Sequence, residues 1–153
     1  MNTVTVRGAR DDDYAWAAAL MSSSEPWITL RRDFDSCRRA CTSPSDVLEI
    51  AESGGERCGL VLIRPAGVAG APYIVSIAVA EPHRSRGVGA ALLALVEQAW
   101  QSRSRHLFLC VSSFNTRARQ FYERHGFKAV GAFPDFIIEG ADEILMHKSL
   151  GRG

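Results

Sequence analysis

The chain has 153 residues, of which 46% are apolar and 23% charged, and its formal net charge is +1. This length suits one domain with a substantial core, and the composition excludes a disordered or membrane-spanning chain. We expect a single domain over residues 1–153. We also expect a cytoplasmic protein, because the first residues lack the basic and apolar runs of a signal peptide.

The hydrophobic periodicity predicts strands and helices in an order that requires a mixed sheet. In chain order we expect a strand at 3–9, helices from Asp11 and over 30–41, strands at 46–52, 57–64 and 73–80, a helix at 88–103, a strand at 106–111, a helix at 115–125, and strands at 128–138 and 142–148. The helix at 88–103 implies that the strands on either side of it are parallel, whereas the hairpins imply antiparallel pairs. The fold class predicted is therefore α/β, with helices on both faces of one mixed sheet.

Charge is distributed unevenly along the chain. Residues 84–128 contain eight basic and two acidic residues, whereas residues 1–83 contain eight basic and eleven acidic residues. Residues 129–153 contain two basic and four acidic residues. A basic centre between acidic flanks favours a polyanionic ligand, although solvated helix faces produce the same pattern.

Cysteine and histidine residues show no metal-ligand spacing. The four cysteines are Cys37, Cys41, Cys58 and Cys110, and the four histidines are scattered along the chain. We therefore expect free thiols and no metal site.

One segment predicts a phosphate-binding turn. The strand at 73–80 is followed by Arg84-x-x-Gly87-x-Gly89 and then by the long helix. Glycine lets the backbone approach a ligand closely, and the first N–H groups of a helix have no helical partners. The residues expected to bind phosphate are Arg84, Ser85, Arg86, Gly87, Val88, Gly89 and Ala90.

Two other nucleotide-binding motifs fit this segment poorly. Leu92 occupies the sixth position of a Rossmann fingerprint counted from Gly87, where glycine or alanine is needed, and the Gly-Lys-Ser/Thr of a P-loop is absent. A strand-to-helix turn without any ligand remains an alternative.

A second motif, Asn115-x-x-Ala118-x-x-Phe121-Tyr122-Glu123-x-x-Gly126-Phe127, follows one predicted strand later. Together the two motifs resemble the GNAT superfamily of N-acetyltransferases, in particular the bacterial protein-N-terminal alanine acetyltransferases. The expected order of elements resembles the family core over nearly the full chain. This resemblance implies acetyl-CoA as cosubstrate, with the CoA pyrophosphate on the first motif and the pantetheine arm along the helix of the second.

The resemblance also implies roles for single residues. Backbone groups of Ile77, Ala78 and Val79 would bind the pantetheine amides and polarise the thioester, on a strand that bulges and separates from its neighbour. Tyr122 would be the general acid, since a phenol is protonated at neutral pH. Asn115, Ala118 and Phe121 would contact the pantetheine arm. As alternatives, Tyr122 is a core residue and Asn115 is a helix N-cap.

The general base and the acceptor site are less defined. Cys110 stands where the alanine acetyltransferases have a glutamate, and a neutral thiol is a poor base. Candidate bases are Glu25, Tyr73, Asp135 and Glu143, with ordered water as the alternative. The residues expected at the acceptor site are Glu25, Trp27, Tyr73 and Asp135. The segments expected to line the acceptor entrance, residues 1–83 and 129–153, carry net charges of −3 and −2. Carboxylates there favour a small cationic amine, which Trp27 could hold by cation–π contact.

Two further functions are alternatives to acetyl transfer. A non-catalytic acyl-CoA-binding module stays open, because the expected glutamate is missing. Nucleic-acid binding is disfavoured, because no aromatic platform accompanies the arginines. We expect a small-molecule or peptide amine as acceptor, no nucleic-acid or membrane partner, and a monomer or homodimer.

Overall fold

The computed structural model describes residues 3–151. Its elements are β1 (Val4–Gly8), α1 (Asp13–Ser22), α2 (Phe34–Cys41), β2 (Val47–Ser53), β3 (Glu56–Val68), β4 (Ala71–Val79), a 3-10 turn η1 (Glu81–His83), α3 (Val88–Trp100), β5 (His106–Ser112), α4 (Thr116–Arg124), β6 (Lys128–Phe133) and β7 (Glu143–Ser149). Apart from η1, the predicted order of strands and helices is confirmed.

Seven strands form one sheet in the order β1-β2-β3-β4-β5-β7-β6. All neighbouring pairs are antiparallel except β4 and β5, which are parallel and are joined by the crossover helix α3. The predicted mixed sheet and its one parallel pair are thus confirmed.

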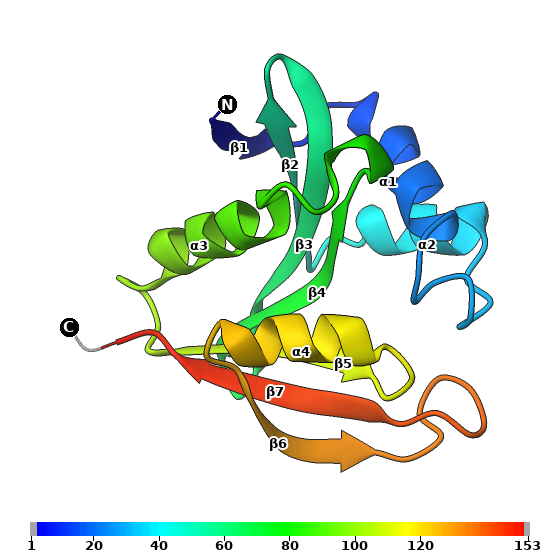
Figure 1. Cartoon of the computed structure of the whole chain (residues 1–153), viewed down its shortest axis with the longest axis vertical. Helices are drawn as coiled ribbons and strands as arrows, with labels where there is room; N and C mark the ends of the chain where they lie inside the picture. Colours follow the sequence, from blue (N-terminus) through cyan, green and yellow to red (C-terminus); the bar gives the residue numbers. More distant parts are fainter. Residues whose placement is uncertain (1–2, 152–153) are drawn as a thin grey trace.

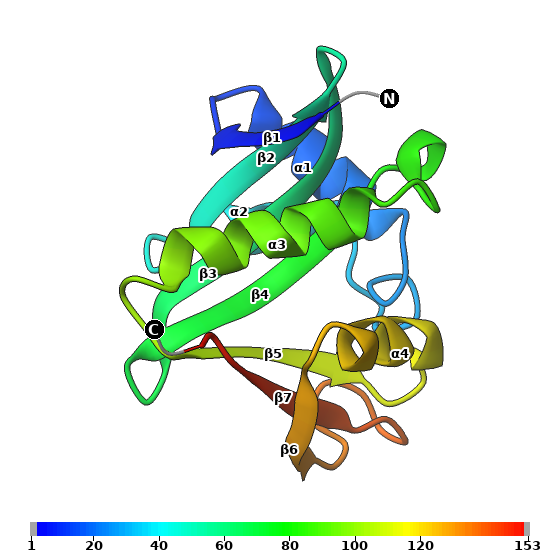
Figure 2. The same cartoon turned by 60° about the vertical axis from the view of Figure 1, so that its left-hand side comes forward.

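Helices cover both faces of the sheet, as Figures 1 and 2 show. On one face α3 and α4 bury apolar side chains such as Leu92, Val96 and Tyr122. On the other face α1 and α2 bury a separate group that includes Ala17 and Cys41. The four cysteines are free thiols, as expected.

A buried carboxylate fixes the start of α1. Asp13 has no exposed surface, and its oxygens accept hydrogen bonds from Arg7 at 2.6 Å, from Arg57 at 3.0 Å and from the Arg10 backbone N–H at 2.8 Å. These charge-assisted bonds connect α1 to β1 and β3. The helix therefore begins at Asp13 rather than at Asp11, where the sequence placed it.

The second helix is shorter than predicted. It begins at Phe34, not at residue 30, because Asp33 is its N-cap and accepts a hydrogen bond from the Ser36 N–H at 2.9 Å. Arg31 has a φ of 59°, which the helix cannot accommodate. Residues 23–33 therefore form one long connection between α1 and α2.

Two other predicted boundaries were wrong. The turn expected at 65–72 shrinks to two residues, Ala69 and Gly70, both with positive φ, so that β3 and β4 form a longer hairpin. The strand expected at 128–138 ends at Phe133. Residues beyond it form a loop in which Asp135 has a φ of 52° and accepts a hydrogen bond from the Gly140 N–H at 2.6 Å.

Strands β4 and β5 separate soon after they meet. Their pairing is limited to Tyr73 with Phe108 and Ile74 with Leu109. On the other side of β4, the register with β3 shifts so that Val75 is an extra residue, a β-bulge. The bulge bends β4 where it leaves β5, which opens the sheet between the two strands.

Among residues 3–151, no helix combines the length and apolar character needed to cross a membrane.

Candidate active site

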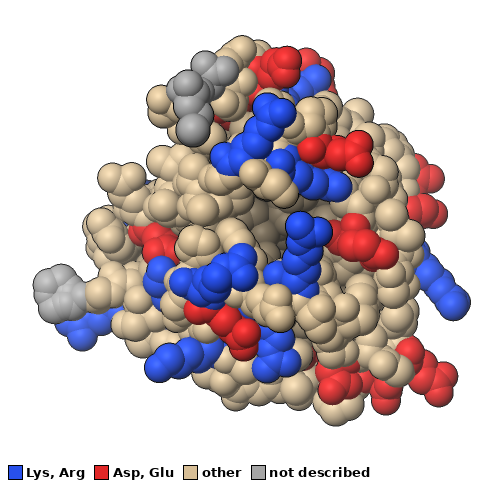
Figure 3. Space-filling view, viewed as in Figure 1, with Lys and Arg blue, Asp and Glu red and all other residues tan. Residues whose placement is uncertain are grey.

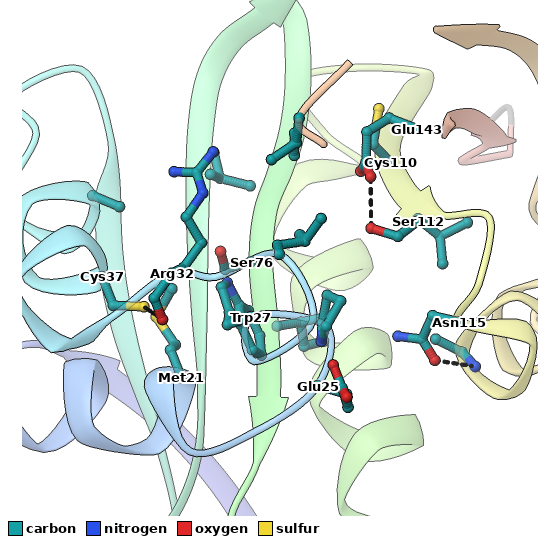
Figure 4. A pocket seen from close by; sticks show the side chains of 18 of the residues that line it. Met21, Glu25, Trp27, Arg32, Cys37, Ser76, Cys110, Ser112, Asn115 and Glu143 are labelled. Carbon is teal, nitrogen blue, oxygen red and sulfur yellow. Dashed lines mark hydrogen bonds between the residues drawn. The ribbon is translucent and has the colours of Figure 1, made fainter. Parts of the chain in front are cut away.

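A cleft of about 460 Å³ lies where β4 and β5 separate. Its walls come from β4, from the end of β5, from α4, from β7 and from the connection between α1 and α2. Figure 4 shows Ser76 of β4 between the residues of the α1–α2 side and those of β5 and β7. Segments distant in sequence thus meet at this one opening of the sheet.

The edge of β4 that faces the cleft carries free backbone groups. Beyond Ile74 no pairing with β5 is found in the described part of the chain, while Ile77, Ala78 and Val79 remain paired with β3. Every second residue of a strand directs its N–H and C=O toward a given edge. This part of β4 therefore offers hydrogen-bond donors and acceptors to an extended ligand.

The turn before α3 presents a run of free amides. The first helical hydrogen bond runs from the Ala91 N–H to the Gly87 oxygen at 3.0 Å, and for the amides of residues 85–90 no acceptor is found within residues 3–151. Gly87 has a φ of +79°, which favours glycine, and Ser85 has a φ of 62°. Successive free N–H groups at a helix N-terminus favour an anion such as phosphate.

The two sequence motifs meet in space at Gly89. A Cβ atom built on Gly89 would lie 3.4 Å from the ring of Phe121, so glycine lets the α4 aromatic ring lie against the start of α3. Arg84 behaves differently from the expectation, because its guanidinium turns back onto the protein. Its Nε donates to the Val79 oxygen at 2.8 Å, and its terminal nitrogen Nη2 donates to Ser24 Oγ at 2.9 Å. Arg84 thus fixes the turn.

Figure 3 shows Lys and Arg side chains gathered around a hollow on the face that carries α3 and α4. This face includes the segment 84–128, which has eight basic and two acidic residues. A positive field around the free amides would attract a polyanion.

Tyr122 lies on the buried side of α4 and also lines the cleft. Its ring packs edge-on against Phe121 and Phe127, with centroid distances of 5.4 and 5.9 Å. Burial raises the pKa of its hydroxyl above the ordinary value of a tyrosine. Within the described residues this hydroxyl has no hydrogen-bond partner, so its proton is available to a ligand in the cleft.

A cluster of polar side chains lines the cleft beside the point where β4 and β5 part. Glu143 of β7 is only 7% exposed and accepts a hydrogen bond from Ser112 Oγ at 2.6 Å. Burial raises the pKa of Glu143, although the Ser112 bond and the positive charge of Arg32 oppose this rise. Tyr73 and Cys110 are neighbours of this carboxylate, and burial raises the pKa of each. Both groups are therefore neutral at physiological pH.

Other predicted site residues have mixed outcomes. Trp27, Asn115 and Ala118 line the cleft. Asn115 is also the N-cap of α4, since its Oδ1 accepts a hydrogen bond from the Ala118 N–H at 3.3 Å. Glu25 lines the cleft too, but its carboxylate accepts hydrogen bonds from the Thr29 backbone at 3.1 Å and the Thr29 hydroxyl at 2.7 Å.

The prediction for Asp135 needs correction. Its side chain is exposed and outside the cleft lining, because it bonds the Gly140 N–H and closes its own loop. The following residues, Phe136 and Ile137, reach the cleft instead.

Sequence reasoning missed several lining residues, above all Arg32 and Ser112. Arg32 was placed inside a helix, and the N-cap pattern Asp33-x-x-Ser36 would have moved it into the preceding loop. Ser112 follows the strand at 106–111 and gave no signal of its own. The two arginines of the lining, Arg32 and Arg64, balance Glu25 and Glu143, so the acidic excess expected at the acceptor site is not found there.

No group of three or more His, Cys, Asp or Glu side chains suited to a metal ion is found in the described chain.

The model of the acetyltransferase (GNAT) family matches residues 12–127. An uncharacterized N-acetyltransferase of Methanocaldococcus jannaschii is 35% identical over 78 residues, which cover 50% of this chain and 50% of that protein. The chain spans about half the length of the curated relatives that it matches, 50% and 46% for two of them.

Solved structures share the fold. A GNAT-family acetyltransferase of Desulfovibrio desulfuricans superposes with a TM-score of 0.81 at 23% identity, over 97% of this chain and 100% of that chain. A GNAT-family acetyltransferase of Elizabethkingia anophelis with acetyl-CoA bound has a TM-score of 0.72 at 21% identity, over 96% and 98% of the two chains. At these identities the likeness concerns the fold.

Proposed function

Because the chain belongs to the acetyltransferase (GNAT) family, we propose that it transfers the acetyl group of acetyl-CoA directly to a primary amine in a ternary complex. The observation that carries the proposal is the free edge of β4 beside the buried, unpartnered hydroxyl of Tyr122. A thioester bound along that edge would have a backbone N–H for its oxygen and a proton donor for its sulfur.

The donor would bind along the α3 and α4 side of the cleft. Free amides of residues 85–90 and the surrounding positive charge suit the pyrophosphate of CoA. The edge of β4 at 77–79, where the Val79 oxygen already accepts a hydrogen bond from Arg84, suits the amides of the pantetheine arm. Asn115 uses its oxygen as a helix cap, which leaves its amide nitrogen to donate a hydrogen bond to that arm.

In the transfer step, the amine nitrogen attacks the thioester carbon and the oxygen becomes negatively charged. A backbone N–H of β4 would stabilise this oxyanion by about 3 kcal/mol. The carbon–sulfur bond then breaks, and the leaving thiolate takes the proton of Tyr122. The buried phenol is protonated near neutrality, so it can supply this proton as the carbon–sulfur bond breaks.

We assign the general base to Glu143 among the candidates from the sequence. Glu25 is exposed and bound to Thr29, and Asp135 lies outside the cleft. The raised pKa of Tyr73 makes its phenol unable to accept a proton near neutrality. Glu143 is the buried carboxylate of the lining, and a raised pKa brings it closer to that of an ammonium group, which favours proton transfer.

The test is an activity screen with purified protein and acetyl-CoA. Free amino acids, polyamines, aminoglycosides and peptides with free N-termini are offered as acceptors. Release of CoA thiol is followed together with the mass of the acetylated amine. We expect stoichiometric thiol and acetylated product with at least one class. Tight binding of acetyl-CoA by calorimetry without product from any class would contradict the proposal and favour a non-catalytic acyl-CoA-binding module.

A further inference from the structure

The charged side chains of the cleft lining differ in whether they have a partner. Arg64 forms two hydrogen bonds with the Asp46 carboxylate, at 2.7 and 3.1 Å. Glu143 and Glu25 also accept hydrogen bonds from the protein. Within residues 3–151, the guanidinium of Arg32 has neither an ion-pair nor a hydrogen-bond partner.

Local structure holds Arg32 at the cleft. Its backbone N–H donates to the Trp27 oxygen at 2.9 Å, which closes the connection between α1 and α2. The next residue is the N-cap of α2, so the backbone on both sides of Arg32 is fixed. The side chain therefore extends from a loop with a fixed backbone. An arginine on such a loop loses less conformational entropy on binding an anion than an arginine on a flexible loop.

Arg32 and Glu143 stand on opposite sides of the cleft. Figure 4 shows Arg32 on the α1–α2 side and Glu143 on the β7 side, with Ser76 of β4 between them. The two charges influence each other, since Arg32 opposes the rise in the pKa of Glu143. The cleft thus has a cationic and an anionic wall.

We propose that the acceptor is an amine that also carries a carboxylate, as a free amino acid does. Its carboxylate is bound by Arg32, and its amine nitrogen faces Glu143. This inference rests on the proposed function and adds the chemical class of the acceptor. A guanidinium presents parallel N–H groups that match a carboxylate, whereas a second ammonium group placed there would be repelled. Arg32 therefore reverses the preference for cationic amines that the segment charges favoured.

The experiment compares matched acceptors on wild type and variants. L-leucine, L-leucinamide and 3-methylbutylamine share one side chain and differ in the carboxylate. With wild type we expect kcat/KM for the amino acid to exceed that of the amide by about 10- to 100-fold, mainly through KM, the range for a charge-assisted hydrogen bond. If leucine itself is not a substrate, the same series is built on the best amino acid of the screen.

The variant Arg32→Gln separates recognition of the carboxylate from the basicity of the amine. For each acceptor, the ratio of kcat/KM in wild type to kcat/KM in the variant cancels the intrinsic reactivity of that acceptor. We expect the ratio to be about 10 to 100 for the amino acid and close to one for the amide and the amine. Arg39→Gln is the matched control, since it removes the same charge from exposed α2 surface outside the cleft. It should leave all three acceptors unchanged.

Three results would overturn the inference. An equal fall in kcat/KM for the amino acid and the amide in Arg32→Gln would assign Arg32 a structural role. A higher Kd for acetyl-CoA in that variant, which means weaker binding, would place Arg32 on the donor side. A wild-type preference for polyamines would show that no carboxylate is recognised, while the proposed acetyl transfer would stand. Absence of acetylated product with every acceptor class would instead overturn the proposed function, and this inference with it.

Discussion

Replacing Tyr122 by phenylalanine removes the proposed proton donor and leaves the packing of the ring in place. The ring contacts Phe121 and Phe127, whereas the hydroxyl has no hydrogen-bond partner among the described residues. Truncation therefore leaves no protein group unpaired, and the free energy of unfolding should change by less than about 1 kcal/mol. Acetyl-CoA affinity should also be nearly unchanged, because the proton is needed only as the sulfur leaves.

The rate of transfer should respond strongly to the same change. Loss of a general acid lowers kcat by about 10²- to 10⁴-fold, which corresponds to about 2.7 to 5.4 kcal/mol of barrier at 1.36 kcal/mol for each factor of ten. Burial raises the pKa of Tyr122 above 10, so the deficit should persist across the neutral range rather than depend on pH.

Single-turnover measurements isolate this step from product release. Wild type, Tyr122→Phe and Tyr14→Phe are mixed with saturating acetyl-CoA and acceptor, and the acetylated product is quantified over time. Tyr14 lies on α1 outside the cleft lining, so its variant controls for the loss of a tyrosine hydroxyl as such. A single-turnover rate of Tyr122→Phe within twofold of wild type would remove Tyr122 from the mechanism.

Three further predictions concern the base, the turn and the core. Glu143→Gln should lower kcat/KM by about 10²-fold or more. Because burial raises the pKa of Glu143, the wild-type rate should rise with pH as this carboxyl ionises above the ordinary range of a glutamate, and the variant should lack this rise. Gly87→Ala should weaken acetyl-CoA binding in calorimetry, because a φ of +79° costs a non-glycine residue about 1 kcal/mol and the added methyl group would meet the phosphates of a CoA bound at this turn. Asp13→Asn should lower the urea-unfolding free energy by about 3–5 kcal/mol, because Arg7 and Arg57 lose their buried partner. Arg7 lowers the pKa of Asp13, so this stabilisation is present above the unfolded carboxyl pKa of about 3.9 and is lost as the pH falls below it. Matched changes at exposed positions serve as controls: Glu139→Gln, Gly131→Ala and Asp12→Asn.

The fold was largely predictable because its signals are local. The apolar stripe of α3 and the β4–α3–β5 order determine a parallel pair, and hairpin spacing determines the antiparallel pairs β2–β3, β3–β4 and β6–β7. The antiparallel pairs β1–β2 and β5–β7 join strands that other elements separate in the chain, so hairpin spacing does not determine them. The predicted ends of helices and strands were wrong where a single residue overrides the hydrophobic periodicity. Asp33 caps α2 and shortens it, and Asp135 turns the chain and ends β6 early.

The proposed donor half of the site leaves a clearer signal in the sequence than the proposed acceptor half, for a physical reason. The donor half would use consecutive backbone groups of residues 85–90 and one helix, and these residues are close together in the chain. The acceptor half joins Arg32, Ser112 and Glu143, which approach one another only because the sheet opens between β4 and β5. No sequence spacing indicates that these residues lie close together in the fold. From the sequence, Glu143 was therefore only one of four candidate bases, and Arg32 was not identified.

The same opening would let the proposed donor and acceptor meet without any movement of an element. A bulge at Val75 bends β4 away from β5, and the free backbone edge that results faces Tyr122 on α4 and Glu143 on β7. A thioester bound along β4 would therefore lie between a proton donor from one helix face and a carboxylate from the far strand. The proposed transfer uses two groups, one that takes the proton of the amine and one that gives a proton to the sulfur. An unbroken sheet could not supply both, because its ladder bonds would occupy the edge of β4 that the thioester needs.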